Sequence, residues 1–135
     1  MTSHEATARP RPARRPDEDP VAKAERLVKL YRRGSEEIHA LKGIDLALYP
    51  GEFVCLLGPS GAGKTTTLNL LGLMDRPTGG RLSVAGRAVG EGKVTEDGLD
   101  HIRRDNVGFI FQQFYLMATL SALENVEMPQ LWTGK

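Results

Sequence analysis

Residues 58–65 read Gly-Pro-Ser-Gly-Ala-Gly-Lys-Thr, and this stretch decides more about the fold than any other part of the chain. It matches the pattern G-x-x-x-x-G-K-[ST], a loop whose backbone N–H groups surround a polyphosphate. Glycine lets the backbone turn tightly and approach the anion closely. In this pattern Lys64 reaches the β- and γ-phosphates. The hydroxyl of Thr65 is placed to bind Mg²⁺, a cation that prefers oxygen ligands.

The sequence on either side of the loop has the context that the motif requires. Phe53–Leu57 is apolar without polar alternation, which predicts a strand buried on both faces. Thr66–Leu73 follows the loop, and its four leucines predict a buried helix. Strand, glycine-rich loop and helix are expected in this order because the helix N-terminus supplies the anion site.

Composition indicates one globular domain. The chain has 135 residues, of which 40% are hydrophobic and 26% charged, and no stretch approaches the 18 consecutive apolar residues of a membrane span. The net charge of +1 suggests no particular partner, and no nucleic-acid partner is expected. The single cysteine, Cys55, excludes an internal disulfide. It lies within the predicted strand, which favours a buried core side chain over a reactive thiol.

Residues 1–20 differ from the rest of the chain. They contain four of the eight prolines and few apolar side chains, which predicts a disordered tail. Four arginines are balanced by four acidic residues, and no aromatic side chains lie between them for stacking on bases. A solvated tail is therefore favoured over a basic contact patch.

Further elements follow from periodicity. Val21–Tyr31 has apolar residues at helical spacing, whereas residues 38–48 alternate as in a half-buried strand. Short strands are expected at Arg81–Ala85 and Val107–Phe111, and a short helix at Thr95–Arg104.

A capping box predicts the last helix of the chain. Ser121 is followed three residues later by Glu124, a pairing that begins helices. This helix is expected to run through about Met128, where Pro129 ends or bends it.

Several stretches beyond the phosphate loop match one family. Tyr31 precedes Arg-Arg-Gly, residues 40–46 read Ala-Leu-Lys-Gly-Ile-Asp-Leu, and residues 50–52 read Pro-Gly-Glu. Residues 109–112 read Phe-Ile-Phe-Gln. With the phosphate loop, these stretches resemble the ATP-binding subunit of ABC transporters over about residues 22–132.

Two more stretches narrow the resemblance within that family. Residues 70–80 read Leu-Leu-Gly-Leu-Met-Asp-Arg-Pro-Thr-Gly-Gly, and residues 123–129 read Leu-Glu-Asn-Val-Glu-Met-Pro. Both are similar to the branch that serves lipoprotein release and macrolide export.

The resemblance implies an α/β fold, a P-loop NTPase (RecA-like) core with an antiparallel β subdomain. Residues 21–135 would be the N-terminal part of an ABC-type nucleotide-binding domain, with the helical subdomain begun after about residue 113. Against the helical period of Val21–Tyr31, the resemblance implies a strand there that delivers Tyr31 to the nucleotide.

The same resemblance implies ATP and Mg²⁺ as ligands. Tyr31 would stack on adenine, and Gln112 of the family's Q-loop would offer its amide oxygen to the metal or to a water beside the γ-phosphate. Gln113 is the alternative to Gln112. Lys64 and Gln112 would be the catalytic residues, and Thr65 and Gln112 the metal ligands. The phosphate-loop contacts, or Walker A residues, would be Gly58, Pro59, Ser60, Gly61, Ala62, Gly63, Lys64, Thr65 and Thr66.

The second half of such a site is not found. The sequence has no Ser-Gly-Gly signature and no apolar run ending in Asp-Glu. We therefore expect a truncated domain, roughly the first half, that binds nucleotide weakly and does not turn over ATP by itself.

The function implied is to energise an ABC membrane transporter through Mg-ATP binding and hydrolysis. The implied partners are a transmembrane permease, contacted by Phe114–Leu120, and a second ATP-binding subunit. The implied location is cytoplasmic, at the inner face of the cell membrane. A truncated nucleotide-binding module without catalysis is the alternative, and a phosphate-loop kinase or GTPase is a third possibility.

Overall fold

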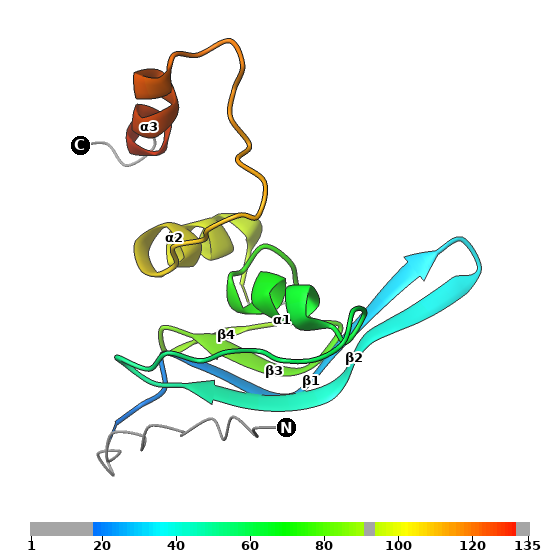
Figure 1. Ribbon diagram of the computed structural model, residues 1–135. Coiled ribbons are helices and arrows are strands. Elements are labelled where there is room, and N and C mark those ends of the chain that lie inside the picture. The colour runs from blue at the N-terminus through cyan, green and yellow to red at the C-terminus, as the bar shows by residue number, and fades with distance from the viewer. Residues whose placement is uncertain (1–17, 91–93, 132–135) are drawn as a thin grey trace, which may run out of the picture.

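The computed structural model describes residues 18–90 and 94–131, so most of the predicted tail lies outside the described residues. The described residues form strands and helices in the order shown in Figure 1. These elements are β1 (Ala22–Arg33), β2 (Glu36–Leu48), α1 (Lys64–Leu71), β3 (Gly79–Val84), β4 (Arg87–Val89), α2 (Glu96–Asn106) and α3 (Ala122–Leu131).

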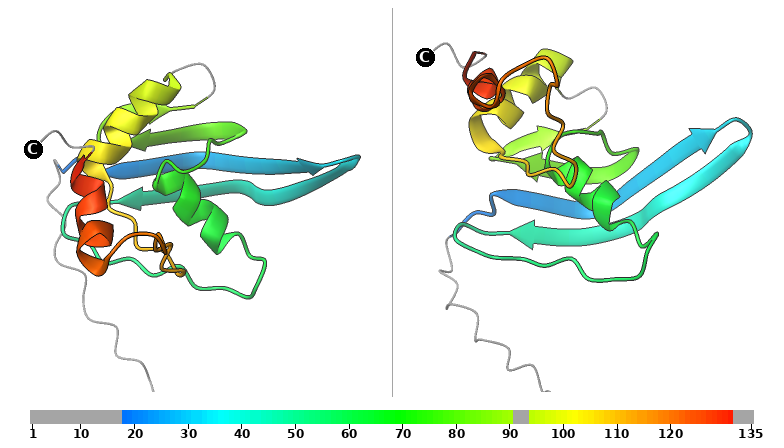
Figure 2. Two further views of the ribbon diagram at one scale, coloured as in Figure 1. Left: turned by 90° about the horizontal axis from the view of Figure 1, so that it is seen from above. Right: turned by 45° about the horizontal axis from the view of Figure 1, so that its top comes forward.

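The four strands form one antiparallel sheet in the order β2-β1-β3-β4. β1 is central, and its first residue, Ala22, is paired with Leu48 of β2 and with Val84 of β3. Figure 2 shows that the β1–β2 hairpin extends well beyond the other two strands. Tyr31 lies in this extension, opposite Ile38.

The helical period of Val21–Tyr31 is explained by a β-bulge. The pairing of β1 with β2 shifts between Ala24 and Leu27, and Arg26 has a φ of 47°. Buried positions therefore fall at residues 22, 24, 27 and 29, because the extra residue interrupts the alternation. The prediction of a helix from spacing was wrong, and the strand that the resemblance implied is confirmed.

The core lies between the sheet and the two helices that cover one of its faces, α1 and α2 (Figure 1). Six side chains are almost completely buried: Leu27, Leu70, Leu73, Leu82, Val89 and Ile102. They come from β1, α1 and the turn after it, β3, β4 and α2, so one apolar cluster joins the sheet to both helices.

Two apolar runs predicted as buried strands are not strands. Phe53–Leu57 and residues 107–111 lie outside the sheet, and the side chains of Phe53, Leu57 and Ile110 are 96%, 89% and 98% exposed. Cys55 is likewise exposed, which overturns its prediction as a core residue. A strand needs a neighbour to satisfy its backbone N–H and C=O groups. Within the described residues neither run has one.

The remaining sequence predictions are close to the observed elements. α1 begins two residues earlier than expected and buries only Thr67 and Leu70, whereas Leu68 is half exposed. β2, β3 and α2 are confirmed to within two residues.

α3 begins as predicted but extends further. The Ser121 N–H donates to Glu124 Oε2 over 2.7 Å, and the Glu124 N–H donates back to Ser121 Oγ over 3.3 Å, which confirms the capping box. Pro129 lies inside α3, two residues before its end. It has no N–H to donate to the carbonyl four residues earlier, so the last turn of α3 lacks that hydrogen bond.

The connection from α2 to α3 is extended, and it carries α3 away from the sheet (Figure 1). Among the helices of the described ranges, none combines the length and apolar character needed to cross a membrane.

Candidate nucleotide-binding site

The phosphate loop turns sharply into α1. Gly61 and Gly63 have φ values of 80° and 84°, in the left-handed region that favours glycine. The Ala62 N–H donates to the Pro59 oxygen over 3.2 Å, which closes a tight turn within the loop. Gly63 is the N-cap residue of α1 and lies against β2. A Cβ there would come within 2.6 Å of the Ala40 oxygen, so no larger residue fits.

The N-terminus of α1 is open. No side chain caps it, and the hydroxyl of Thr67 donates to the Gly63 oxygen rather than accepting from an N–H group. The first N–H groups of a helix lack acceptors within the helix and carry a partial positive charge. An uncapped helix N-terminus of this kind is a favourable position for phosphate and other anions.

Lys64 places its ammonium over the same loop. Its Nζ donates to the backbone oxygens of Gly58, over 2.9 Å, and Pro59, over 2.6 Å. The ammonium thus lies at the loop, and its hydrogen-bond acceptors are carbonyl oxygens of the loop. A bound phosphate would replace these carbonyls with a charged acceptor, which makes a stronger hydrogen bond.

The donors at the start of α1 fit a magnesium ion carried by a nucleotide. Within residues 18–90 and 94–131, no three His, Cys, Asp or Glu side chains are grouped to hold a metal. Mg²⁺ at phosphate sites commonly keeps several waters and uses one or two protein oxygens besides the phosphates. The Thr65 hydroxyl belongs to an exposed residue at the second position of α1, where it could supply one such oxygen.

A cavity of about 230 Å³ lies beside the loop, and Lys64, Ala62, Leu57 and Leu41 contribute to its lining. A larger cavity, of about 310 Å³, lies against β1, β3 and β4 around Gly79–Arg81. The charged side chains in that lining already pair with one another, Glu25 with both Lys23 and Arg81. Of these two cavities, only the smaller has phosphate-loop residues, Ala62 and Lys64, in its lining.

Tyr31 lies near the end of β1 with 37% of its surface exposed. Its hydroxyl donates to Asp75 Oδ2 over 2.8 Å. Burial, and then the hydrogen bond and charge of Asp75, raise the pKa of Tyr31, while the Thr66 hydroxyl opposes this rise. The structure thus brings Tyr31 next to the first turn of α1, where the phosphate loop ends.

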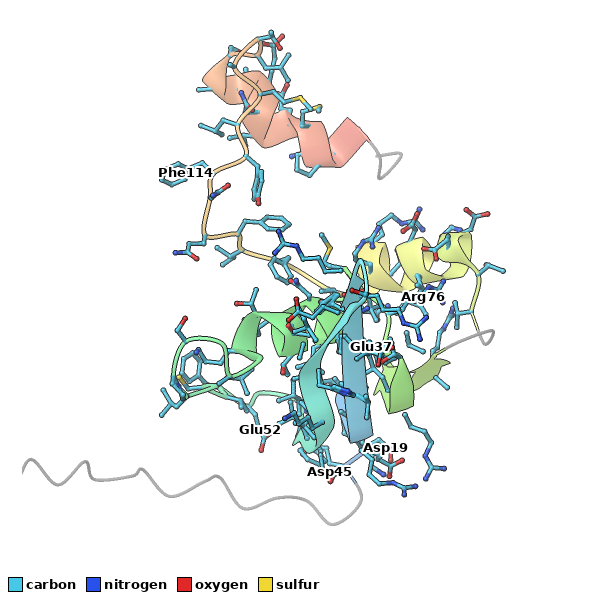
Figure 3. All side chains as sticks on the ribbon, turned by 90° about the vertical axis from the view of Figure 1, so that its right-hand side faces the viewer. Asp19, Glu37, Asp45, Glu52, Arg76 and Phe114 are labelled. Carbon is cyan, nitrogen blue, oxygen red and sulfur yellow. The ribbon has the colours of Figure 1, made fainter. Side chains whose placement is uncertain are left out.

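Gln112 is not brought to the loop by any contact within the described residues. It is exposed in a bend after residues 107–111, beside Gln113. The neighbouring aromatic rings pack on one another, with Phe111 edge-on to Tyr115 at 5.2 Å between centroids. Figure 3 shows Phe114 on the connection between α2 and α3, and its side chain is 90% exposed.

Sequence reasoning missed two residues of this region. Lys29 and Asp75 form an ion pair next to Tyr31, with 2.6 Å between Nζ and Oδ1. Lys29 is two residues before Tyr31, and both side chains contact Asp75, so they lie on one side of β1 despite the register shift between Lys29 and Leu30. In the sequence, a spacing of two residues indicates a shared side only if Val21–Tyr31 forms a strand and not a helix.

Comparison with known proteins gives one consistent result. The model of the ABC transporter family matches residues 41–134. The lipoprotein-releasing system ATP-binding protein LolD 1 of Rhodopseudomonas palustris is 46% identical over 112 residues, 82% of this chain and 49% of that protein. The macrolide export ATP-binding/permease protein MacB of Hyphomonas neptunium is 44% identical over 85% of this chain and 18% of that protein.

A solved structure gives the same result. The ATP-binding cassette MJ0796, determined as a dimer in a post-hydrolysis state bound to ADP and Pi, matches with a TM-score of 0.75 and 44% identity. The match covers 82% of this chain and 47% of that one. The sequence of MJ0796, from Methanocaldococcus jannaschii, is likewise matched over 47% of its length. The chain therefore spans about half the length of these cassettes.

Proposed function

The chain belongs to the ABC transporter family, and from this premise we propose that it binds Mg-ATP as the first half of a nucleotide-binding domain that energises a membrane transporter. The observation that carries the proposal is the phosphate loop. It leads directly into the uncapped N-terminus of α1, and the Lys64 ammonium is hydrogen-bonded to the loop. A triphosphate is bound by main-chain N–H donors, a helix N-terminus and an ammonium, and all three lie together here.

Each part of the nucleotide has a proposed partner in this chain. The loop amides and Lys64 bind the β- and γ-phosphates, and the Thr65 hydroxyl and Gln112 amide oxygen hold the metal. When bound, Mg²⁺ neutralises charge that develops on the phosphates. Tyr31 offers its ring to adenine, a kind of stacking worth about 1–3 kcal/mol per base. The partial exposure of that ring, close to Thr66, supports this role.

Hydrolysis is proposed for the complete domain and not for this chain alone. Phosphoryl transfer needs groups that position the attacking water and balance charge on all sides of the γ-phosphate. The residues identified here surround one side of it. We therefore propose that these 135 residues bind nucleotide but do not turn it over.

The proposed partners are a transmembrane permease and a second ATP-binding subunit. One relative is an ATP-binding/permease protein and another cassette forms a dimer, which supports both. Phe114–Leu120 is proposed as the permease contact, because Phe114, Tyr115 and Leu116 are 90%, 70% and 69% exposed. Such contacts would hold the protein at the inner face of the cell membrane.

The test is calorimetric titration of the full chain with Mg-ATP, Mg-GTP and ATP in EDTA. We expect Mg-dependent ATP binding that Lys64→Ala weakens at least tenfold. Lys42→Ala, which removes an exposed lysine of β2, is the matched control and should leave binding unchanged. Binding that survives Lys64→Ala would contradict the phosphate-loop assignment. Phosphate release in repeated turnovers, abolished by Lys64→Ala, would contradict the proposal that this chain lacks turnover.

A further inference from the structure

An ion pair holds the hydroxyl end of Tyr31. Lys29 Nζ donates to Asp75 Oδ1 over 2.6 Å and to the Arg76 oxygen over 2.7 Å. The other carboxylate oxygen of Asp75 accepts from the Tyr31 hydroxyl over 2.8 Å. Lys29 is only 8% exposed, although it is a lysine in a strand. A buried ammonium is costly unless it is paired, so Asp75 is required where it is.

Asp75 cannot shift independently of β1. The Arg76 N–H donates to Asp75 Oδ1 over 2.7 Å. Thr78, three residues after Asp75, links the turn after α1 to β1 by hydrogen bonds. The Thr78 N–H donates to the Val28 oxygen over 3.0 Å, and the Leu30 N–H donates to Thr78 Oγ1 over 2.9 Å. The turn after α1 and the strand that carries Tyr31 therefore form one hydrogen-bonded unit.

Asp75 remains a carboxylate in this setting. Burial alone would raise its pKa, but hydrogen bonds from Lys29, Tyr31 and the Arg76 backbone lower the pKa below its ordinary value. An ionised carboxylate accepts hydrogen bonds and donates none. The Tyr31 hydroxyl must therefore donate to it, which fixes the direction in which the ring points.

One face of the Tyr31 ring is occupied as well. Lys29 Nζ lies over it, 4.9 Å from the centroid, within the range of a cation–π contact. The ring is thus held at its hydroxyl by Asp75 and on one face by Lys29, while 37% of the residue remains exposed. A flat ligand could stack on the face that Lys29 does not cover.

We propose that Asp75, held by Lys29, is a positioning residue that fixes the Tyr31 ring for stacking on the nucleotide base. This inference rests on the proposed role of Tyr31. Its physical basis is preorganisation, because a side chain that is already ordered loses less conformational freedom when the ligand binds. The free-energy range for ordering one such side chain corresponds to about a two- to twelvefold change in affinity.

The experiment compares two ligands on the full chain. Mg-ATP carries a base, whereas inorganic tripolyphosphate with Mg²⁺ presents the phosphates alone. Tyr31→Phe keeps the ring and removes the hydroxyl, and Asp75→Asn keeps the shape and removes the charge. We expect each variant to weaken ATP binding about two- to twelvefold and to leave tripolyphosphate binding unchanged. The double variant should bind ATP no more weakly than Tyr31→Phe does, because once the hydroxyl is gone the side chain at position 75 has no hydrogen bond to the ring.

Two controls keep this test decisive. Asp105→Asn removes an exposed carboxylate paired with Arg104 on α2, and should change neither affinity. Tyr31→Leu removes the ring and should weaken ATP binding further than Tyr31→Phe does. If Asp75→Asn disturbs folding, Tyr31→Phe still tests the inference, because it leaves the Lys29–Asp75 pair in place.

The outcomes separate this inference from the proposed function. Unchanged ATP affinity in Tyr31→Phe overturns the inference, and so does an equal loss for ATP and tripolyphosphate, which would indicate a structural role only. Failure of Lys64→Ala to weaken tripolyphosphate binding overturns the proposed function instead. Absence of binding of both ligands to the unaltered chain overturns both.

Discussion

A Cβ atom at Gly63 would lie 2.6 Å from the backbone oxygen of Ala40 and 2.7 Å from Leu41 Cδ2, so the end of the phosphate loop is packed directly against β2. The conformation of the loop is therefore restricted by its packing on β2 as well as by the Ala62–Pro59 hydrogen bond within its own turn. Because neither the Ala40 carbonyl nor the loop can move without disturbing its neighbours, position 63 admits glycine alone.

The first prediction concerns this contact. Gly63→Ala should destabilise the chain by more than Gly61→Ala. Both glycines have positive φ, which costs an L-residue about 1–2 kcal/mol, but a Cβ at Gly61 would meet open space. Urea unfolding followed by circular dichroism gives the two free energies of unfolding. Equal values would mean that the contact with Ala40 is not as close as described.

The second prediction separates the core from the exposed apolar runs. Leu27 is 0% exposed, so Leu27→Ala should lower the free energy of unfolding by about 2–5 kcal/mol. Leu57 is 89% exposed, so Leu57→Ala should change it by less than about 0.5 kcal/mol. Thermal or urea unfolding measures both. A large loss in Leu57→Ala would show that residues 53–57 are packed in solution.

The third prediction is a pH dependence. The pKa of Asp75 is lowered in the folded chain, so its contribution to stability is present above the unfolded value, about 3.9. That contribution is lost as the pH falls toward the lower folded value. Asp75→Asn should therefore differ most from the unaltered chain at neutral pH, and the difference should shrink as the pH falls below about 4. Urea unfolding at these pH values measures it, and a difference that grows on acidification would contradict the Asp75 assignment.

The fourth prediction is the opposite dependence at alkaline pH. The pKa of Tyr31 is raised, so its contribution is complete below the unfolded value of about 10 and is lost as the pH rises through the folded value. Absorbance at 295 nm should show one tyrosine that ionises late, and Tyr31→Phe should remove that phase. A late phase that persists in Tyr31→Phe would contradict its assignment to Tyr31.

The fifth prediction concerns the start of α2. Thr95 Oγ1 accepts from the Gly98 N–H over 3.2 Å as the N-cap of this helix. Thr95→Ala should cost about 0.5–2 kcal/mol of stability, whereas Thr95→Ser keeps the oxygen and should cost much less. Equal losses in the two variants, measured by thermal unfolding, would point to the lost methyl group instead of the cap.

The sequence alone predicted the parts of this structure that depend on local chemistry. The turn glycines of the phosphate loop, the Thr95–Arg104 helix and the Ser121–Glu124 cap are short-range patterns, and each element forms where it was expected. The strand of Tyr31 required the family resemblance, because the bulge at Arg26 gives a strand the spacing of a helix.

What could not be predicted depends on contacts distant in the chain. Phe53–Leu57 has the composition of a buried strand, but composition does not say whether a neighbouring strand is available. The pairing of Lys29 with Asp75 joins positions 46 residues apart, and no periodic pattern indicates it. The roles of Lys64, Tyr31 and Gln112 stay predictions until ligand binding is measured.

The two apolar runs that have no strand partner among the described residues, 53–57 and 107–111, also affect how this protein behaves at high concentration. Short apolar segments rich in β-branched and aromatic residues are the material from which cross-β fibrils stack, and neither run contains a charge or a proline. A net charge of +1 provides little mutual repulsion between molecules. During storage at high concentration, fibrillar association of these runs should therefore remove folded protein from solution before the core between α1 and the sheet unfolds.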